Sequence, residues 1–452
     1  MARLFKTIAL YRAAFCASIT CQLIALAATV ACAQPAASNP SPSASTHPPA
    51  GTTIDATNLP AYEQILPAAA QLAVTRGLTI KIVPTERFDW PGGFTTATEK
   101  YSAQVGLDKT DAITNYIAGM PFPIFSPSDP KAAIKIAYNW HMGPFMPDDF
   151  ELAPWGSFAY SSTGAPNTFV AEEPNNYVCA NFHFLRFAHR TEVEPRPTLG
   201  ANPDGVEWKA RCDDWTSDAD GHKGARGIWV RYLDPKKVDY FYYLDRGSLP
   251  GGMQSYDALN ETCRGCHQPY WAYALPKTEQ FSYRLLGTVP MLACLTAEHE
   301  PAGLVQNDKT LSLDAEAFQL RNAYVLEMTS LIPDYENLRT LVYIDTETYV
   351  WLSAEFFDGS ERTAAAFPLW RTHPAPSGGY HFELAGELYF PTAPLRPHHV
   401  KVGGGFPFVK IDDAPKLYLR SLAPAHGGFS QKINTGDVPT EIFDPGRLRR
   451  KP

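Results

Sequence analysis

The sequence lacks the short motifs that identify several large enzyme classes. It has no glycine fingerprint for a dinucleotide and no alternation of strand and helix patterns, so a nucleotide-binding α/β fold is not expected. It also has no His-Glu-x-x-His motif, no Ser-His-Asp order and no suitably spaced pair of carboxylates, which disfavours hydrolytic functions. The glycine run at 403–405 stands alone and is typical of a turn rather than of a phosphate-binding loop.

Positive charge is outnumbered by negative charge in this chain. There are 39 Lys and Arg residues against 47 Asp and Glu residues, which gives a formal net charge of -8. This balance provides no basic patch, so neither nucleic acid nor anionic lipid is expected as an electrostatic partner. Hydrophobic residues make up 45% of the chain and aromatic residues 12%, which is enough for a substantial folded core.

The N-terminal region has no acidic residue at all before Asp55. Arg3, Lys6 and Arg12 precede a mostly apolar stretch over residues 13–31. A basic start followed by an apolar run is typical of an export signal. We therefore expect the folded part of the protein to lie outside the cytoplasm, in the periplasm.

The apolar stretch is followed by a cleavage pattern. Ala31 and Ala33 place small residues where a signal peptidase reads them, so residues 1–33 are predicted to be a removed signal peptide. Lipidation at Cys32 and a retained anchor stay open as alternatives, because about 20 apolar residues suffice to span a bilayer. Residues 34–52 are rich in Pro, Ser, Ala and Thr, a composition that predicts a flexible linker.

Cysteine is infrequent, with eight residues in the chain, but one pair has the spacing of a cofactor site. Cys263-Arg264-Gly265-Cys266-His267 reads C-x-x-C-H, the attachment motif of a c-type haem. Two thiols at this spacing can bind both vinyl groups of one porphyrin, and the adjacent imidazole can bind its iron. We predict one covalent haem c, attached to Cys263 and Cys266, with His267 as the proximal iron ligand.

Two other interpretations of this motif are weaker. Cys263 and Cys266 could form a redox-active or structural disulfide beside a surface histidine. A zinc site is disfavoured further, because the sequence has no second cysteine pair at the spacing that zinc sites use.

The residue on the other side of the iron decides between two chemistries. A methionine or a second histidine closes the iron and makes an electron carrier, whereas an open position allows a small molecule to bind. Met253, ten residues before the first thiol, is our leading candidate for this distal ligand. The haem site is thus expected around residues 253–275. Further candidates by residue type are Met142, Met146, Met291, His141 and His299.

Aromatic residues and a histidine pair near these motifs have two interpretations each. Tyr270, Trp271 and Tyr273 follow the motif and fit either the porphyrin edge or ordinary core packing. His398 and His399 are adjacent, so in a strand they would point to opposite faces, and a turn is the better interpretation.

Three cysteines remain outside the signal and the motif. In an oxidising compartment Cys179 and Cys212 could close a disulfide loop of ordinary size. Cys294 would then be a buried, inert thiol. The sequence does not fix this connectivity.

The mature chain reads as one mainly β domain over residues 53–445, followed by a basic tail at 446–452. A helical pattern is expected at about 59–76. Residues 227–233 and 238–244 form a hairpin pattern around Asp-Pro-Lys-Lys. Further strand patterns occupy 182–187, 324–328, 341–344, 349–357, 380–389, 408–411 and 417–422. Successive short strands with polar turns favour a large curved antiparallel sheet, or open β-barrel, with covering helices and a haem-bearing insertion.

Several segments resemble a little-characterised bacterial family, domain of unknown function 1329, which is related to the LolA- and LolB-like outer-membrane lipoprotein-sorting proteins. The resemblance is clearest at 115–123, Asn-Tyr-Ile-Ala-Gly-Met-Pro-Phe-Pro, and extends over roughly residues 60–390. Residues 231–235 and 281–287 are also similar to family segments. The resemblance implies an open, strongly curved sheet wrapped around helices, with an apolar concavity for a lipid-like ligand, and implies no catalytic residues. This chain departs from the family at 245–252, where relatives carry an arginine-rich stretch.

Three functions follow from these patterns. The main hypothesis is an exported mono-haem c-type cytochrome that transfers electrons in the cell envelope to or from a redox partner protein. The second is a haem-dependent oxidoreductase acting on a hydrophobic substrate. The third is an envelope carrier of lipid or another hydrophobic molecule, associated with the outer membrane, in which haem is structural.

Overall fold

The structure is a computed structural model, and it divides the chain into two units, residues 1–47 and residues 48–452. The described residues all belong to the second unit. They are 48–144, 147–153, 155–162, 168–171, 177–179, 181–217, 222–234, 237, 240–244, 253–257, 278–296, 310–312, 316–331, 339–391, 417–421 and 430–449.

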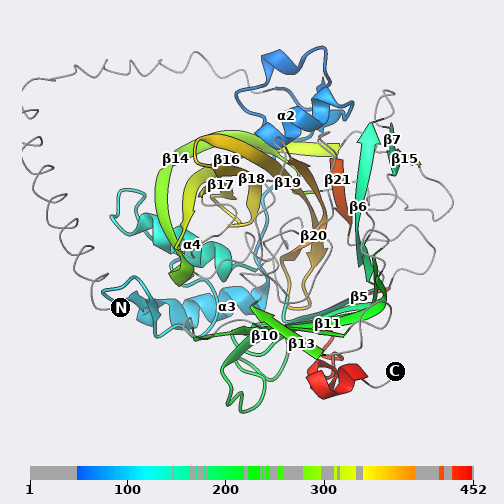
Figure 1. Ribbon diagram of the computed structural model, residues 1–452. Coiled ribbons are helices and arrows are strands. Elements are labelled where there is room, and N and C mark those ends of the chain that lie inside the picture. The colour runs from blue at the N-terminus through cyan, green and yellow to red at the C-terminus, as the bar shows by residue number, and fades with distance from the viewer. Residues whose placement is uncertain are drawn as a thin grey trace, which may run out of the picture. The chain divides into compact units, whose positions relative to one another are not determined.

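The described part is dominated by one large sheet and carries three α-helices (Figure 1). The helices are α2 (Ala68–Thr75), α3 (Gly92–Tyr101) and α4 (Ala132–His141). None of these described helices is long and apolar enough to cross a membrane.

The main sheet can be followed strand by strand from one free edge to the other, and every pairing along this path is antiparallel. In spatial order the path runs through β13 (Met253–Asp257), β12 (Tyr240–Leu244), β11 (His222–Tyr232), β10 (Val206–Ser217), β8 (Tyr177–Cys179), β6 (Trp155–Ser162), β21 (Leu417–Ser421), β20 (Tyr380–Pro391), β19 (Glu361–Pro374), β18 (Trp351–Asp358), β17 (Arg339–Asp345), β16 (Glu316–Ser330) and β14 (Phe281–Ala293).

The remaining strands are short and pair beside this path. The one parallel pairing among the described strands joins β2 to β16. The short strands are β1 (Thr53–Ile54), β2 (Ile80–Ile82), β3 (Gly106–Leu107), β4 (Ile113–Thr114), β5 (Asp149–Ala153), β7 (Thr168–Ala171), β9 (Asn181–Arg186), β15 (Thr310–Ser312) and β22 (Ser430–Ile433).

The two ends of the main path are consecutive strands in the sequence. Among the described strands, β13 pairs with β12 alone and β14 pairs with β16 alone. Residues 258–277, which follow β13 and precede β14 in the sequence, are outside the described part. We call the two ends of the described path, at β13 and at β14, the seam.

The sheet is apolar on both faces because successive side chains of a strand point to opposite sides. In β19, Ala364 and Ala366 belong to one buried cluster, whereas Ala365 and Phe367 belong to the other. The first cluster includes α3 and α4, which lie inside the curve of strands β14–β20 (Figure 1). The second includes α2, which packs on the outer face of β18, β19 and β20. The core is thus divided into an inner and an outer layer.

The inner layer is anchored by tryptophans. Trp140 of α4, Trp351 of β18 and Trp370 of β19 are all fully buried in it. The indole N–H of Trp370 donates to the carbonyl oxygen of Trp351 at 2.7 Å, which satisfies a buried donor. The helices therefore cover, with apolar side chains, the inner face that the family resemblance assigned to a ligand.

Most of the predicted fold is confirmed, at the level of a mainly β structure with curved antiparallel pairing and few helices. The predicted hairpin forms as β11 and β12, with Val230 opposite Tyr240. The expected strand at 408–411 lies outside the described residues.

Two predicted boundaries differ from the structure. The helix expected over 59–76 is a 3-10 turn at Leu59–Ala61 followed by α2, because Pro67 interrupts the pattern and instead precedes the first residue of α2. The fold also continues into the predicted basic tail, since Leu448 is fully buried against Val206 and Ile228.

Candidate functional site

The predicted haem ligands are placed by their sequence positions alone. Cys263, Cys266 and His267 fall within residues 258–277, outside the described residues, so their contacts stay a prediction. Met253 is the first residue of β13 and pairs with Leu244 of β12, but its side chain is also outside the described part. In the sequence the motif therefore follows β13 and precedes β14.

The other candidates for the distal iron ligand lie at different positions in the chain. Met291 is buried in the inner core layer at the far end of β14. Met142 follows α4 and lines a small pocket described below. His141 contacts a carboxylate, and Met146 and His299 lie outside the described residues. The described candidates therefore do not converge on one point.

Several polar groups lie close together just before β14. Thr278 is buried at the start of a 3-10 turn, Thr278–Gln280, that leads directly into β14. The hydroxyl oxygen of Tyr138 on α4 lies 3.4 Å from Oε1 of Glu279 and accepts a hydrogen bond from the amide of Ile113 at 3.0 Å. Burial raises the pKa of Tyr138 above its usual value, so this hydroxyl stays protonated. This contact attaches α4 to the β14 side of the seam.

A buried carboxylate attaches α4 to β10. Glu207 of β10 lies with Oε1 3.1 Å from Nε2 of His141 and with Oε2 3.1 Å from Nε of Arg231 on β11. All three side chains are less than a tenth exposed. Burial alone would raise the pKa of Glu207, but the nearby His141 and Arg231 outweigh it and hold the pKa well below its usual range. The carboxylate is therefore ionised at neutral pH.

The histidines of this cluster are neutral at neutral pH. Burial lowers the pKa of His141, although Glu207 opposes the shift. Burial also lowers the pKa of His189 to about 4. Nδ1 of His189 donates to the carbonyl oxygen of Ile117 at 2.7 Å, and its ring packs on Tyr116 with a centroid distance of 4.5 Å. His189 has φ of 64°, a left-handed conformation that histidine adopts more readily than most residues other than glycine.

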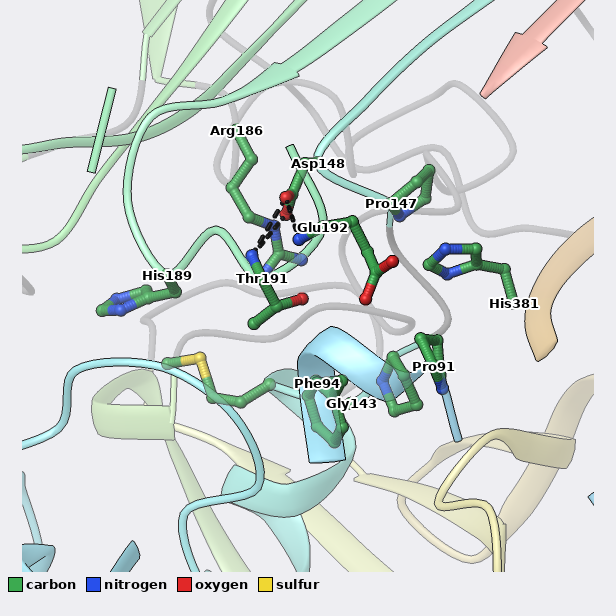
Figure 2. A pocket seen from close by; sticks show the side chains of 12 residues that line it. Pro91, Phe94, Gly143, Pro147, Asp148, Arg186, His189, Thr191, Glu192 and His381 are labelled. Atoms are coloured by element: carbon green, nitrogen blue, oxygen red, sulfur yellow. Dashed lines mark hydrogen bonds between the residues drawn. The ribbon is translucent and has the colours of Figure 1, made fainter. Parts of the chain in front are cut away.

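A small pocket lies beside this cluster (Figure 2). Its cavity of about 10 Å³ has room for one water molecule and not for an organic ligand. Burial raises the pKa of Glu192, whose Oε2 accepts a hydrogen bond from Ser377 at 2.7 Å. The lining residues are Pro91, Phe94, Met142, Gly143, Pro144, Pro147, Asp148, Arg186, His189, Thr191, Glu192 and His381.

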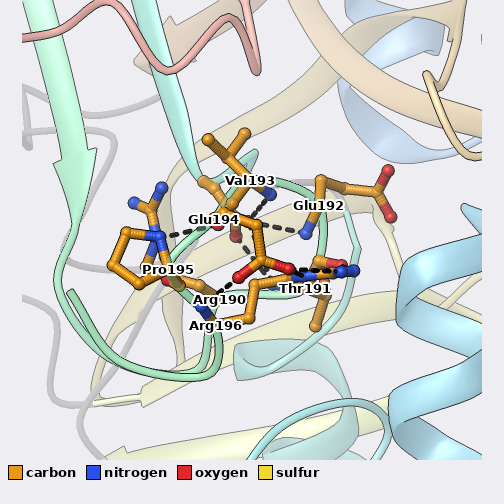
Figure 3. A network of polar contacts seen from close by, with 8 residues as sticks. Arg190, Thr191, Glu192, Val193, Glu194, Pro195 and Arg196 are labelled. Carbon is orange, nitrogen blue, oxygen red and sulfur yellow. Dashed lines mark hydrogen bonds and ion pairs between the residues drawn. The ribbon is translucent and has the colours of Figure 1, made fainter.

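The loop over residues 190–196, which carries Glu192 (Figure 3), binds one carboxylate with its backbone amides. Oδ2 of Asp148 accepts the backbone amides of Thr191, Glu192 and Val193 at 2.9, 2.7 and 2.9 Å. The guanidinium of Arg190 donates back to the carbonyl oxygen of Arg186 at 2.7 Å. The loop approaches the start of α3 so closely that a Cβ on Gly93 would collide with the carbonyl oxygen of Thr191, which explains the glycine. These contacts are structural, and they hold the pocket's shape.

For the described residues, possible metal ligands and the state of two cysteines are known. Among the described residues no three His, Cys, Asp or Glu side chains are placed to hold a metal ion. Cys212 is disulfide-bonded. Its predicted partner Cys179 ends β8, and the pairing stays a prediction because that side chain is not described. Cys294 is a buried free thiol, as predicted.

The contact between His141 and Glu207 was not found from the sequence. Histidine and glutamate are 66 positions apart, on a helix and a strand that the sequence does not place together. The only signal was that His141 falls among apolar residues at the end of a helical stretch. Such a position is compatible with a core histidine as well as with a ligand.

Three solved structures are similar in fold over most of their own length. A DUF1329 family protein from Desulfovibrio piger is 10% identical, with 70% of this chain and 97% of that chain covered and a TM-score of 0.40. A putative outer membrane lipoprotein-sorting protein domain from Vibrio parahaemolyticus is 10% identical, with 71% and 99% covered and a TM-score of 0.42. A LolA superfamily protein from Nitrosomonas europaea is 12% identical, with 69% and 97% covered and a TM-score of 0.34.

Sequence comparison is more limited. No curated protein matches the chain significantly in sequence. Residues 53–165 match the model of a family described as a protein of unknown function, DUF1329. This match confirms, over the N-terminal part of the folded unit, the resemblance to the DUF1329 family that the sequence motifs predicted.

Proposed function

We propose that this protein is an exported mono-haem c-type cytochrome that transfers electrons in the cell envelope. The observation that carries the proposal is the pentapeptide Cys263-x-x-Cys266-His267, in a chain whose N-terminus has the pattern of an export signal. Both features are needed, because c-type haem is attached after export.

The residues of the motif fit the chemistry of this cofactor. Cys263 and Cys266 supply two thiols for thioether bonds, and His267 supplies an imidazole for the iron. Met253 would supply a second ligand to the iron, which would close it and favour electron transfer over substrate binding. When bound, the haem supplies one-electron redox chemistry, and the protein's part is to attach it, fix its ligands and limit its contact with water.

One structural observation supports the proposal without testing it. Cys212 is disulfide-bonded, which fits a protein that folds in an oxidising compartment.

The carrier function is favoured by a different observation, the match of residues 53–165 to the DUF1329 family that the sequence motifs predicted. In the described part, Ile136, Ala137 and Trp140 of α4 are fully buried in the inner core layer. A hydrophobic ligand on the part of the inner face that these side chains cover would have to displace α4.

The proposal is tested by producing the mature chain in a host that exports it and attaches c-type haem. The expected result is an intact mass increased by one haem, a Soret absorption band and a low-spin reduced spectrum that carbon monoxide does not change. Cys263→Ala with Cys266→Ala should abolish covalent attachment, whereas Cys294→Ala, which removes a thiol elsewhere, should not.

The other functions correspond to different outcomes of the same experiment. Covalent haem with a spectrum that changes on adding carbon monoxide or imidazole would overturn the electron-carrier assignment in favour of the oxidoreductase. Saturable binding of a hydrophobic fluorescent probe, displaced by lipid and independent of haem, would favour the carrier. A folded protein with no haem in a competent host would overturn the proposal as a whole.

A further inference from the structure

Helix α4 contacts two separate parts of the main sheet. It packs against β14 and approaches Glu279 through Tyr138. It also reaches β10 through His141 and Glu207. Between these two polar contacts its apolar side chains, including Trp140, are buried in the inner core layer. The position of α4 therefore determines whether the inner face of the sheet is covered.

The contact with β10 depends on the protonation state of one imidazole. A carboxylate oxygen can only accept, so Nε2 of His141 carries the hydrogen that is donated to Glu207, and the neutral ring has a lone pair on Nδ1. Nδ1 is buried and has no hydrogen-bond partner in the described part of the chain. A protonated ring would add an N–H at this position, and a buried donor without an acceptor is costly.

We propose that His141 is a pH-sensitive clasp, which holds α4 against the sheet at neutral pH and releases it in mild acid. This inference is independent of the proposed haem function. Release would uncover the apolar inner face that α4 fills, and so would regulate access to it.

The groups around His141 both favour and oppose its protonation. Glu207 of β10 favours it, and Arg231 of β11 and Arg186 of β9 oppose it by like charge. His189, in the turn after β9, interacts electrostatically with the same cluster. The carboxylate of Glu207 already interacts with the permanent cation of Arg231, so protonation of His141 would give it a second cation. Burial disfavours this charged imidazole.

The sign of the pH effect follows from linkage. Burial lowers the pKa of His141 in the folded state, whereas in a locally opened state it returns to about 6.5. The opened state therefore binds more protons as pH falls below about 6.5, and the clasp weakens progressively. Above that pH its full contribution is present.

Hydrogen exchange of the full mature chain, read by mass spectrometry, tests this proposal. After correction for intrinsic exchange rates, amides of α4 should lose protection between pH 7 and pH 5, up to about tenfold for each pH unit below about 6.5. Amides of α2, which packs on the opposite face of the sheet, should lose less protection than those of α4 in this interval. His141→Gln can still donate to Glu207 but does not titrate, and it should remove the response of α4.

The controls separate a local clasp from general acid sensitivity. His183 of β9 lies 3.7 Å from Glu151, and burial also lowers its pKa, but it does not contact α4. His183→Gln should leave the response of α4 as in the wild type. Should His141→Gln fail to fold, Glu207→Gln removes the one group that favours protonation, and it should enlarge the loss of protection between pH 7 and pH 5. Equal losses in α2 and α4, or an unchanged response in His141→Gln, would overturn the proposal.

Discussion

Arg321 of β16 and Asp345 of β17 form a buried two-point ion pair. Nε of Arg321 lies 3.0 Å from Oδ1 of Asp345, and Nη2 lies 2.8 Å from Oδ2. Both side chains are almost fully buried. The same carboxylate accepts the amide and the hydroxyl of Thr348 at 2.9 and 2.6 Å, so it also fixes the turn between β17 and β18.

Removing one member of this pair is expected to destabilise the fold strongly. Arg321→Ala leaves Asp345 as a buried charge without its partner, which costs about 3–5 kcal/mol of unfolding free energy. Arg284→Ala, on the exposed pair of Arg284 with Glu327, should cost less than about 1 kcal/mol. Urea unfolding of both variants checks the difference, and similar costs would contradict the assignment of Arg321 as a core ion pair.

The inner core layer should depend on Trp140. Truncating this fully buried indole to alanine is expected to cost about 3–5 kcal/mol, because the surrounding strands cannot collapse into the cavity. Ile124→Ala is the matched surface control, since Ile124 is 91% exposed, and it should change stability by less than about 0.5 kcal/mol. A Trp140→Ala variant as stable as the wild type would show that α4 does not pack on the inner face.

A disulfide at Cys212 should stabilise the folded unit. Its reduction is expected to lower the unfolding free energy by about 2–4 kcal/mol, mainly because the reduced unfolded chain has more freedom. Peptide mapping under non-reducing conditions should find Cys212 joined to Cys179. Cys294 should be recovered as a free thiol in the same digest, and a peptide linking Cys212 to Cys294 would refute this connectivity.

Stability should fall in acid partly because of His189. Its folded pKa of about 4 is below the unfolded value, so its contribution is complete above about pH 6.5 and is lost as pH falls towards 4. His189→Asn keeps a residue that tolerates the left-handed backbone and removes the titration. In the variant, the change of the unfolding free energy over this pH interval should be smaller by about 2 kcal/mol than in the wild type. An unchanged pH profile would show that His189 is not held neutral in the fold.

The hairpin was predictable and the polar cluster was not, for a physical reason. The turn residues between β11 and β12 are a local signal, so a sequence shows them directly. By contrast, His141, Glu207 and Arg231 meet only when α4 is packed beside β10 and β11. The strand β19 was not predicted, because its central residues are buried on both faces and apolar and polar residues do not alternate along it. Pro67 is an intermediate case. A proline is a local signal that a helix ends before it or begins after it, but the helix prediction over 59–76 followed the apolar periodicity around Pro67 instead.

The proposed function depends most on one covalent haem at Cys263 and Cys266. The most direct measurement is the intact mass of the mature chain purified from the periplasm of a host that attaches c-type haem. We predict the mass of the chain plus one haem, with the added mass localised to a peptide containing Cys263 and Cys266. A correctly folded wild-type chain without added mass would contradict the account.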